Sequence, residues 1–405
     1  MFGGYAITNR FIGSISDFLV SIILLLIFFL CVKNFIKKNN LNINLVATLI
    51  IYRAVILLFT LYYASKTGVF DGHGIYNIAG PDYFSVYQFH SSLKTYTGSE
   101  FLSFTLRPLV GYLELSYLSV SLIFFYLGTF AILFCLKIFK NLGFQNNYVN
   151  IFVIALCFNP ALNIFTVSIT KDTIIFFITM LLFYVYFVEK YKTKDLIFFS
   201  VFPIIILYLI RPYLGGIIIA SLFAYYIISI RKIDFKKLTI LFFLTFFVVI
   251  IFYISRDLYA WTYDGNYFEQ IKNFIKLRQD NTNVGNTALG YADSDLIKRF
   301  VQSIFGFGAS SGGIFAPIFF YDQILNFYLF SLIFILKFNN FSYLKNFYYQ
   351  EFKLLKLFII YAFGLYFICS ISLSNFGLIL RLKWMYWPII AFFIISLFQV
   401  NAQKN

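Results

Sequence analysis

The chain has 405 residues, of which 61% are hydrophobic and only 12% are Asp, Glu, Lys or Arg, and its mean hydropathy is +0.82. A soluble domain has about 25% charged residues. Half of that charge cannot keep a surface hydrated, so the composition excludes a soluble enzyme. The apolar residues form long uncharged runs, which are typical of polytopic α-helical membrane proteins and unlike the alternating strands of outer-membrane barrels.

Eleven apolar runs are each close to the ~20 residues that a membrane-spanning helix needs. They lie at about Phe18–Val32, Leu41–Ala64, Ser116–Leu136, Asn147–Phe165, Thr173–Val188, Leu196–Ile210, Pro212–Ile230, Leu238–Ser255, Asp322–Leu336, Leu357–Leu373 and Trp384–Val400. The first run lacks the flanking features of a signal peptide, so we expect a retained helix. The sequence therefore predicts an all-α, polytopic protein that forms one membrane domain over residues 1–405.

Lysine indicates how the helices cross the membrane. Six polar segments that alternate with the spans hold 16 of the 23 Lys. They are Val32–Asn40, Lys137–Phe144, Glu189–Asp195, Arg231–Lys237, Lys337–Lys356 and the tail to Asn405. By the positive-inside rule these segments face the cytoplasm, which places the N-terminus outside and the C-terminus inside. They carry 17 basic residues against four acids, or +13 of the net charge of +15, so we expect the charge to orient the protein and not to bind nucleic acid.

Three segments on the opposite side are too long or too polar to be simple turns. They lie at about Ser65–Leu115, Arg256–Tyr321 and Ser374–Lys383. External segments of this length usually carry function. The sequence therefore directs attention to the outer face of the membrane.

Arginine has the opposite distribution to lysine. Only Arg231 of the nine Arg is on the predicted cytoplasmic side, and Arg53 is in the middle of a span. The other seven are on or near the outer side: Arg10, Arg107, Arg211, Arg256, Arg278, Arg299 and Arg381. Because guanidinium groups form fixed bidentate hydrogen bonds with phosphate, this set favours a lipid-linked phosphate or pyrophosphate as ligand. The alternative is that each Arg pairs with one of the thirteen acids outside the cytoplasmic segments.

Arg53 stands apart from the outer set. An arginine in the middle of a membrane helix costs about 2.5–3.5 kcal/mol on insertion scales and is usually functional or paired. We expect either a carboxylate partner on another helix or a functional role for Arg53.

A second unusual cation is at the predicted outer start of a helix, in Ser168-Ile169-Thr170-Lys171-Asp172-Thr173. Ser or Thr is a natural N-cap, and Asp172 suits the positive end of the helix. Lys171 opposes the helix dipole, but it would help the free N–H groups of the terminus to bind a phosphate. The alternatives are a Lys171 that reaches the membrane interface and an ion pair of Lys171 with an Asp.

Two Arg-Pro pairs follow the same logic. Pro212 ends the helix before it and leaves Arg211 at the carbonyl end, and Arg107-Pro108 lies late in the first external segment. A cation is favourable at a helix C-terminus without any ligand. Either Arg is a cap, or both reach one ligand.

The first external segment carries the groups expected of a sugar site. Asp71, His73 and Asp82 lie there among many Tyr, and carboxylates and aromatic rings are the groups that hold sugar hydroxyls and faces. Asp71, Asp82 or His73 is our candidate for the catalytic base. The alternatives are a metal bound by these three residues and a solvated lid with interfacial Tyr; we expect no metal.

The remaining outer segments contain a glycine-rich stretch and a basic element near the C-terminus. The stretch Phe305–Gly313 follows Lys298-Arg299, and it has neither a Walker lysine nor a GxGxxG register, so it does not predict a nucleotide site. Near the C-terminus, Arg381 and Lys383 precede Trp384-Met385-Tyr386-Trp387. This element is interpreted as an interfacial aromatic belt or as a cradle for an acidic lipid.

These motifs resemble one family of membrane enzymes. Ser168-x-x-Lys171-Asp172 at a helix start, Arg211-Pro212 one hairpin later, and Arg381-x-Lys383 before Pro388 together resemble the Wzy/EpsG-like polysaccharide polymerases of O-antigen and capsule synthesis. The resemblance implies a GT-C-like helical enzyme of the bacterial inner membrane. It would join undecaprenyl-pyrophosphate-linked oligosaccharides at the periplasmic face without a cofactor, and a chain-length regulator could be a partner.

The resemblance also implies roles for individual residues. By position Lys171, Arg211 and Arg381 would bind pyrophosphate, and Asp172, Lys383, Arg107, Arg256, Arg278 and Arg299 complete the proposed substrate-binding set. Other functions remain open: a flippase or transporter for lipid-linked sugars, a GT-C transferase that uses a polyprenyl-phosphate sugar, and a ligase or an acyltransferase using His73 or His90.

Overall fold

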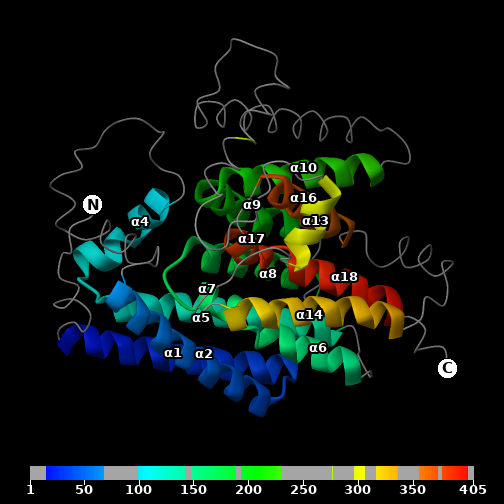
Figure 1. Cartoon of the computed structure of the whole chain (residues 1–405). Helices are drawn as coiled ribbons and strands as arrows, with labels where there is room; N and C mark the ends of the chain where they lie inside the picture. Colours follow the sequence, from blue (N-terminus) through cyan, green and yellow to red (C-terminus); the bar gives the residue numbers. More distant parts are fainter. Residues whose placement is uncertain are drawn as a thin grey trace, which may run out of the picture. The chain divides into compact units, whose positions relative to one another are not determined.

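The computed structural model describes residues 15–67, 99–141, 147–187, 193–229, 276, 296–305, 316–335, 355–372 and 376–399. Every regular element within those ranges is a helix (Figure 1). Among the described residues, four helical stretches are long and apolar enough to cross a membrane: Asp17–Asn39, Ile43–Tyr63, Tyr117–Asn141 and Asn147–Thr166. Shorter apolar helices accompany them. The all-helical prediction is confirmed for this part of the chain, and the apolar helices indicate a membrane protein.

The chain divides into two compact units. Unit 1 comprises Met1–Ile138 and Leu162–Arg211, and unit 2 comprises Phe139–Ala161 and Pro212–Asn405. The sequence predicted one membrane domain, because its apolar runs follow one another without a linker. The chain passes from unit 1 into unit 2 near the end of one helix and returns to unit 1 within a second helix. It passes into unit 2 again at the Arg211-Pro212 junction.

Unit 1 contains the first long helices of the chain. They are α1 (Ile15–Asn39), α2 (Ile43–Thr67), α4 (Ser99–Arg107), the π-helix η4 (Pro108–Tyr112), most of α5 (Tyr117–Asn141), most of α7 (Pro160–Thr166), α8 (Lys171–Phe187) and α9 (Thr193–Ile210). The side chain of Asn42 accepts the N–H of Asn44 at the start of α2, and Asn40 has a φ of 51° at the turn after α1. These two Asn therefore define a tight α1–α2 hairpin.

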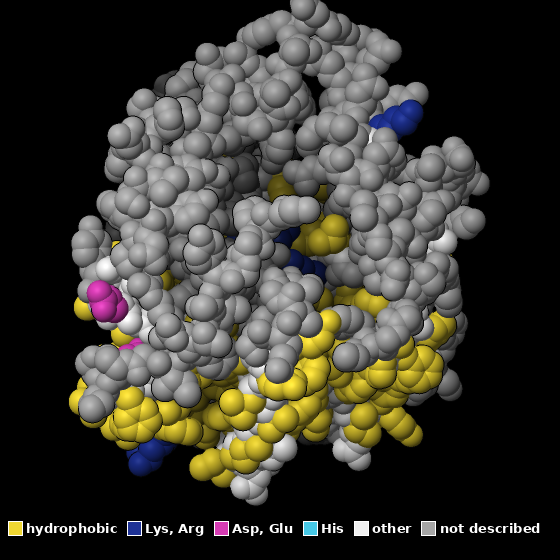
Figure 2. All heavy atoms as spheres, turned by 60° about the vertical axis from the view of Figure 1, so that its left-hand side comes forward, with side chains coloured by type: hydrophobic (Ala, Val, Ile, Leu, Met, Phe, Trp, Pro, Cys, Tyr) yellow, Lys and Arg dark blue, Asp and Glu magenta, His cyan; other side chains and the backbone are white. Residues whose placement is uncertain are grey.

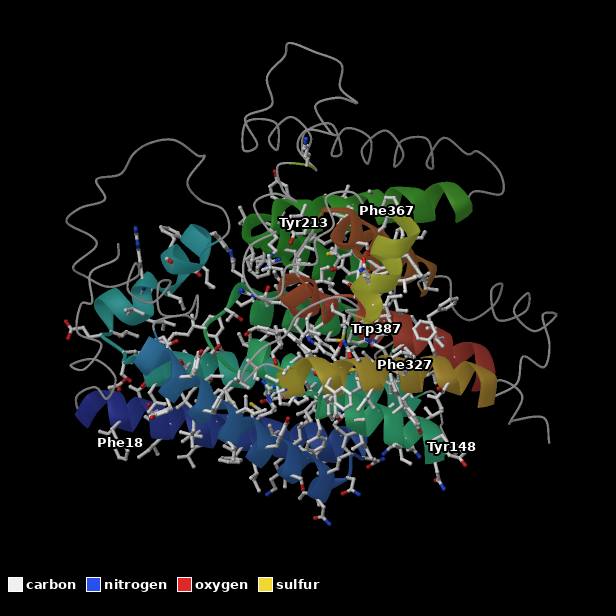
Figure 3. The ribbon with its side chains drawn as sticks, in the orientation of Figure 1. Phe18, Tyr148, Tyr213, Phe327, Phe367 and Trp387 are labelled. Atoms are coloured by element: carbon white, nitrogen blue, oxygen red, sulfur yellow. The ribbon has the colours of Figure 1, made fainter. Side chains whose placement is uncertain are left out.

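Helices α1, α2 and α5 pack beside one another through aromatic and polar side chains. The Phe28 ring of α1 stacks on Tyr126 of α5 with centroids 4.3 Å apart, and Asp17 accepts the N–H of Ser116 and the hydroxyl of Ser119 at the start of α5. A carboxylate at a helix N-terminus satisfies otherwise unpaired N–H groups. The sides of α1 and α2 that face away from α5 are apolar and exposed. Figure 2 shows apolar side chains gathered over the lower face. Phe18 points away from α1 (Figure 3), as a lipid-facing side chain would.

The predicted span Asn147–Phe165 is interrupted. Helix α6 (Asn147–Cys157) ends before Asn159, whose side-chain oxygen accepts the N–H of Ala161 and so caps α7. Pro160 occupies the first position of α7, where a missing N–H has no cost. Asn159-Pro160 therefore ends one helix and begins the next.

Unit 2 contains the remaining helices: α6, α10 (Pro212–Ser229), α13 (Leu296–Phe305), α14 (Ala316–Ile335), α16 (Leu355–Ser372), α17 (Phe376–Lys383) and α18 (Trp387–Gln399). Helix α16 packs on α10, and the Gly364 backbone lies close to Ile217 of α10. Helix α6 packs on α14, where Tyr328 donates to the carbonyl of Tyr148. The Tyr148 ring itself points outward (Figure 3).

The expected spans agree with the helices in position but not everywhere in form. Leu196–Ile210, Pro212–Ile230 and Leu357–Leu373 correspond closely to α9, α10 and α16. The external segments are more helical than expected, because α4, α13 and α17 lie within the three of them. The predicted span Leu238–Ser255 is outside the described residues.

Candidate functional site

The turn between α7 and α8 is buried, and threonine hydroxyls bond two of its backbone carbonyls. The Thr170 hydroxyl donates to the carbonyl of Phe165 at 2.9 Å, and the Thr173 hydroxyl donates to the carbonyl of Ser168 at 3.0 Å. The Thr173 N–H donates to Thr170 Oγ1, so Thr170 caps α8. The sequence predicted a Ser or Thr cap here without choosing between Ser168 and Thr170. The residues Val167, Ser168, Ile169 and Thr170 are all buried.

Asp172 and Arg211 form an ion pair beside this turn. Arg211 Nη2 is 2.6 Å from Asp172 Oδ1, and the side chains are 15% and 3% exposed. Arg211 terminates α9, because its N–H still donates to the carbonyl of Leu207 while Pro212 begins α10. The start of α8 and the end of α9 therefore lie together, as expected for a helical hairpin. Pairing with an acid was one of the two alternatives for Arg211.

Lys171 and Arg107 lie in the same unit as the ion pair. Lys171 is the first residue of α8 and is half-buried. Arg107 ends α4, lies 5.7 Å over the Phe104 ring, and belongs to a helix that contacts α9. Unit 1 thus carries Lys171 and Arg211 at helix ends, where a ligand could meet them, and Arg107 at the junction where α4 continues into η4.

Arg53 is fully buried in the middle of α2. Its Nε donates to Thr129 Oγ1 at 3.0 Å, Nη1 donates to Asn163 Oδ1 at 2.7 Å and to Thr166 Oγ1 at 3.1 Å, and Nη2 donates to the Thr166 carbonyl at 2.9 Å. The four acceptors are neutral oxygens. Arg53 therefore binds side chains on α5 and α7 and the backbone at the end of α7.

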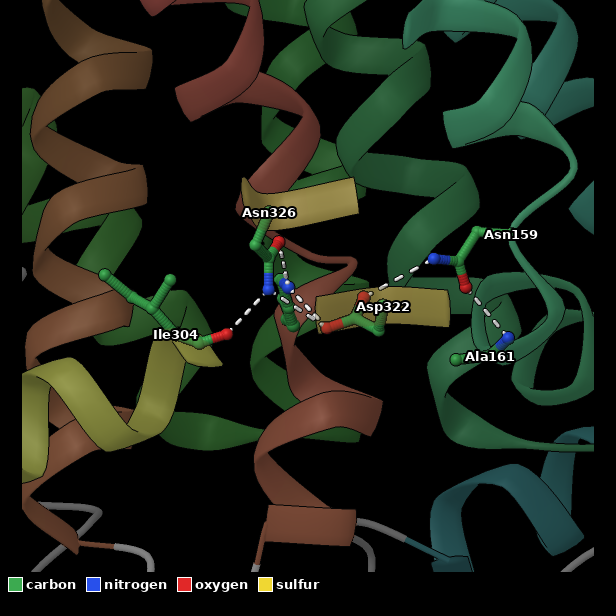
Figure 4. Close-up of polar contacts among 6 residues, drawn as sticks. Asn159, Ala161, Ile304, Asp322 and Asn326 are labelled. Carbon is green, nitrogen blue, oxygen red and sulfur yellow. Dashed lines mark hydrogen bonds and ion pairs between the residues drawn. The ribbon is translucent and has the colours of Figure 1, made fainter. Parts of the chain in front are cut away.

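A second buried polar cluster is in unit 2 (Figure 4). Lys383 Nζ donates to Asp322 Oδ2 and to Asn326 Oδ1, both at 2.7 Å, and the Lys383 and Asp322 side chains are 1% and 0% exposed. Asn326 also donates to the Ile304 carbonyl at 2.6 Å, and Asn159 donates to Asp322 Oδ1 at 3.4 Å. The cluster joins α17 to α14, α13 and the break before α7.

The burial of Lys383 corrects the expected interfacial belt. Trp384, Tyr386 and Trp387 are as fully buried as Lys383, and the Lys383 ammonium is 4.5 Å from the centroid of the Trp387 ring. The polar partners that make this burial tolerable are on α14, 57 and 61 residues away in sequence. Lys383 is consequently an interior residue with an acidic partner. Arg381, two residues before it, is half-buried in the last turn of α17.

The other predicted site residues cannot be placed. Asp71, His73, Asp82, His90, Arg10, Arg256 and Arg278 lie outside the described residues. Arg299 is in α13, but its side chain is also outside the described part. Within the residues that are described, no group of three or more His, Cys, Asp or Glu could hold a metal ion.

Sequence reasoning missed five polar residues of these clusters: Asn159, Asn163, Thr166, Asp322 and Asn326. The sequence feature that could have identified them is their position, because each is a polar residue within or beside an apolar run.

No protein-family model matches the chain, and no curated protein or solved structure is significantly similar to it.

Proposed function

We propose that the protein is a membrane-embedded glycosyltransferase that joins undecaprenyl-pyrophosphate-linked oligosaccharides at the outer face of the bacterial inner membrane. The observation that carries the proposal is the Asp172–Arg211 pair, which brings the two motifs Ser168-x-x-Lys171-Asp172 and Arg211-Pro212 together. A helix N-terminus with a lysine, beside an arginine, has the chemistry of a phosphate site.

The pair with Asp172 is compatible with ligand binding by Arg211. The hydrogen bond to Asp172 uses one N–H of Nη2, and a guanidinium has five N–H donors. Asp172 can hold the guanidinium in place while other N–H groups bind an anion, and the Arg211 side chain keeps 15% of its surface exposed.

The proposed reaction is attack by an acceptor hydroxyl on the anomeric carbon of the donor chain. The bond from that carbon to the pyrophosphate oxygen breaks, and the lipid pyrophosphate leaves with the electron pair. Lys171 and Arg211 stabilise the charge that develops on it. Asp71, Asp82 or His73 is proposed to accept the hydroxyl proton, and a GT-C-like architecture of about eleven spans is part of the same proposal.

One observation favours a second candidate, a flippase for the same lipid-linked sugars. A transporter needs cations within the membrane, and Arg53 and Lys383 are both fully buried. The two functions predict different surface polysaccharide in a strain that lacks the protein. Loss of a polymerase leaves single repeat units on the cell surface, whereas loss of a flippase leaves none.

The experiment therefore combines gene deletion with residue substitutions. In the deletion strain we expect single-unit polysaccharide, and Lys171→Ala and Arg211→Ala should give the same result at normal protein level. Lys37→Ala, an exposed lysine at the end of α1, is the matched control and should keep wild-type chain lengths. Wild-type chains in both site variants would remove Lys171 and Arg211 from the site.

A further inference from the structure

The end of α7 is a buried helix terminus. The last carbonyl groups of a helix have no partner within the helix and need one from elsewhere. Two such carbonyls belong to Phe165 and Thr166, and they accept from Thr170 Oγ1 and Arg53 Nη2 respectively. Thr170 is part of the α7–α8 segment itself. Arg53 comes from α2 and is 113 residues away in sequence.

Arg53 binds this terminus through several matched groups. The Thr129 and Thr166 hydroxyls each donate to a carbonyl of their own helix, at 2.7 Å, and so present lone pairs to the guanidinium. Asn163 presents its carbonyl oxygen. A lysine has one charged nitrogen and could not reach Thr129, Asn163 and Thr166 at once.

Gly128 of α5 makes room for this arrangement. A Cβ at this position would lie 2.0 Å from the Thr166 carbonyl oxygen and 2.5 Å from Arg53 Nη2. Any side chain at residue 128 would therefore displace the end of α7 or the guanidinium. The Thr166 carbonyl and the Arg53 guanidinium therefore both pack directly against the backbone of α5 at Gly128.

We infer that Arg53, seated on Gly128, is a positioning residue that fixes the α7–α8 turn and thereby the start of α8. Only four residues separate Thr166 from Lys171, and all four are buried. Movement of the Thr166 carbonyl would move the Thr170 cap, and with it Lys171 and Asp172. The positioning of the turn rests on the contacts above. Its effect on ligand affinity rests in addition on the proposed function.

The test measures whether the turn opens when Arg53 is replaced. Ser168→Cys places a thiol in the turn, and Thr179→Cys places one farther along α8; both residues are buried, and within the described part of the chain neither hydroxyl has a hydrogen-bond partner. In purified protein whose four native cysteines are replaced by alanine, both thiols should react slowly with a water-soluble maleimide.

Arg53→Met should raise the labelling rate at residue 168 by about tenfold or more, because hydrogen bonds to a charged group are lost. Gly128→Ala should do the same by displacing the carbonyl and the guanidinium, and Arg53→Lys should have an intermediate effect. The rate at residue 179 should not change. Equal protection of residue 168 in wild type and Arg53→Met would overturn the inference. A parallel rise at residues 168 and 179 would also overturn it, because Arg53 would then support the whole of unit 1 and not the turn.

A binding measurement separates this inference from the proposed function. With undecaprenyl pyrophosphate as the probe, Arg53→Met should weaken binding about tenfold although Arg53 is fully buried, since the start of α8 is no longer held. No binding by the wild-type protein would contradict the proposed function alone, because the labelling contrast decides the role of Arg53 without any ligand. Binding that is unchanged in a variant with an open turn would show that the turn does not position the ligand site.

Discussion

Arg211 Nη2 donates a 2.6 Å hydrogen bond to Asp172 Oδ1 and so joins the last residue before α10 to the first turn of α8. The carboxylate is at the positive end of α8 and the guanidinium is at the negative end of α9, so each charge also suits its helix dipole. The pair is therefore stabilised both by the contact between its charges and by the two helix dipoles. Exchanging the two charges would keep the contact but would lose the favourable interaction with the dipoles.

Exchanging the charges tests both sources. Asp172→Ala should lower the free energy of unfolding by about 2 kcal/mol, because it leaves Arg211 mostly buried without this partner. The double variant Asp172→Arg with Arg211→Asp should recover part of that loss but should not extend chains, since it places the wrong charge at each helix end. Melting temperature and polysaccharide length are the two measurements. Full recovery of both would contradict the assignment of Arg211 to ligand binding.

Lys383 and Asp322 should matter for stability more than any surface pair. Lys383→Ala should cost about 3–5 kcal/mol, since it leaves a buried carboxylate without its cation. Lys383→Met combined with Asp322→Leu should cost much less, because neither charge then remains. Unfolding in mixed detergent micelles gives both values. If Lys383→Ala is as stable as wild type, the cluster in Figure 4 does not hold α17 to α14.

Neighbouring phenylalanines of α1 should respond differently to truncation. Phe28 is 2% exposed and stacks on Tyr126, whereas Phe29 is 53% exposed. Phe28→Ala should destabilise the protein by about 2–3 kcal/mol, somewhat less than in a water-soluble core, because lipid replaces water as the alternative surroundings. Phe29→Ala should change the free energy of unfolding little. Equal losses would mean that the exposed side of α1 is covered by protein and not by lipid.

The orientation in the membrane can be tested on unit 1. Lys38 at the end of α1 and Leu113 before α5 are both exposed. By the positive-inside rule, Lys38→Cys should react only with reagents that reach the cytoplasm, and Leu113→Cys should react from outside in intact cells. The opposite pattern would reverse the predicted orientation and would place the Asp172–Arg211 pair on the cytoplasmic side.

The positions of the helices were predictable because hydropathy along the chain is a local property. The helix expected at Ser116–Leu136 is found as α5, and the helix expected at Pro212–Ile230 is found as α10. Helix α4 was missed because a nine-residue helix lacks the length of a membrane span and was assigned to a loop. Caps were predictable at Thr170 for the same local reason.

The partners of the buried charges were not predictable in the same way. Asp172 and Arg211 are at the two ends of one hairpin, so their meeting follows from topology. Lys383 and Asp322 are 61 residues apart, and Arg53 reaches neutral groups 110 or more residues away. The sequence marks such residues as unusual, but the choice among many acceptors is made by tertiary packing.

The cluster around Lys383 gives the protein a built-in optical reporter. Two of the three tryptophans, Trp384 and Trp387, are fully buried there, and the ammonium of Lys383 lies over the Trp387 ring. Indole emission depends on the polarity and charge of its surroundings. The intrinsic fluorescence of the protein should therefore follow the integrity of unit 2 without any added dye, and opening of unit 1 should leave most of that signal unchanged.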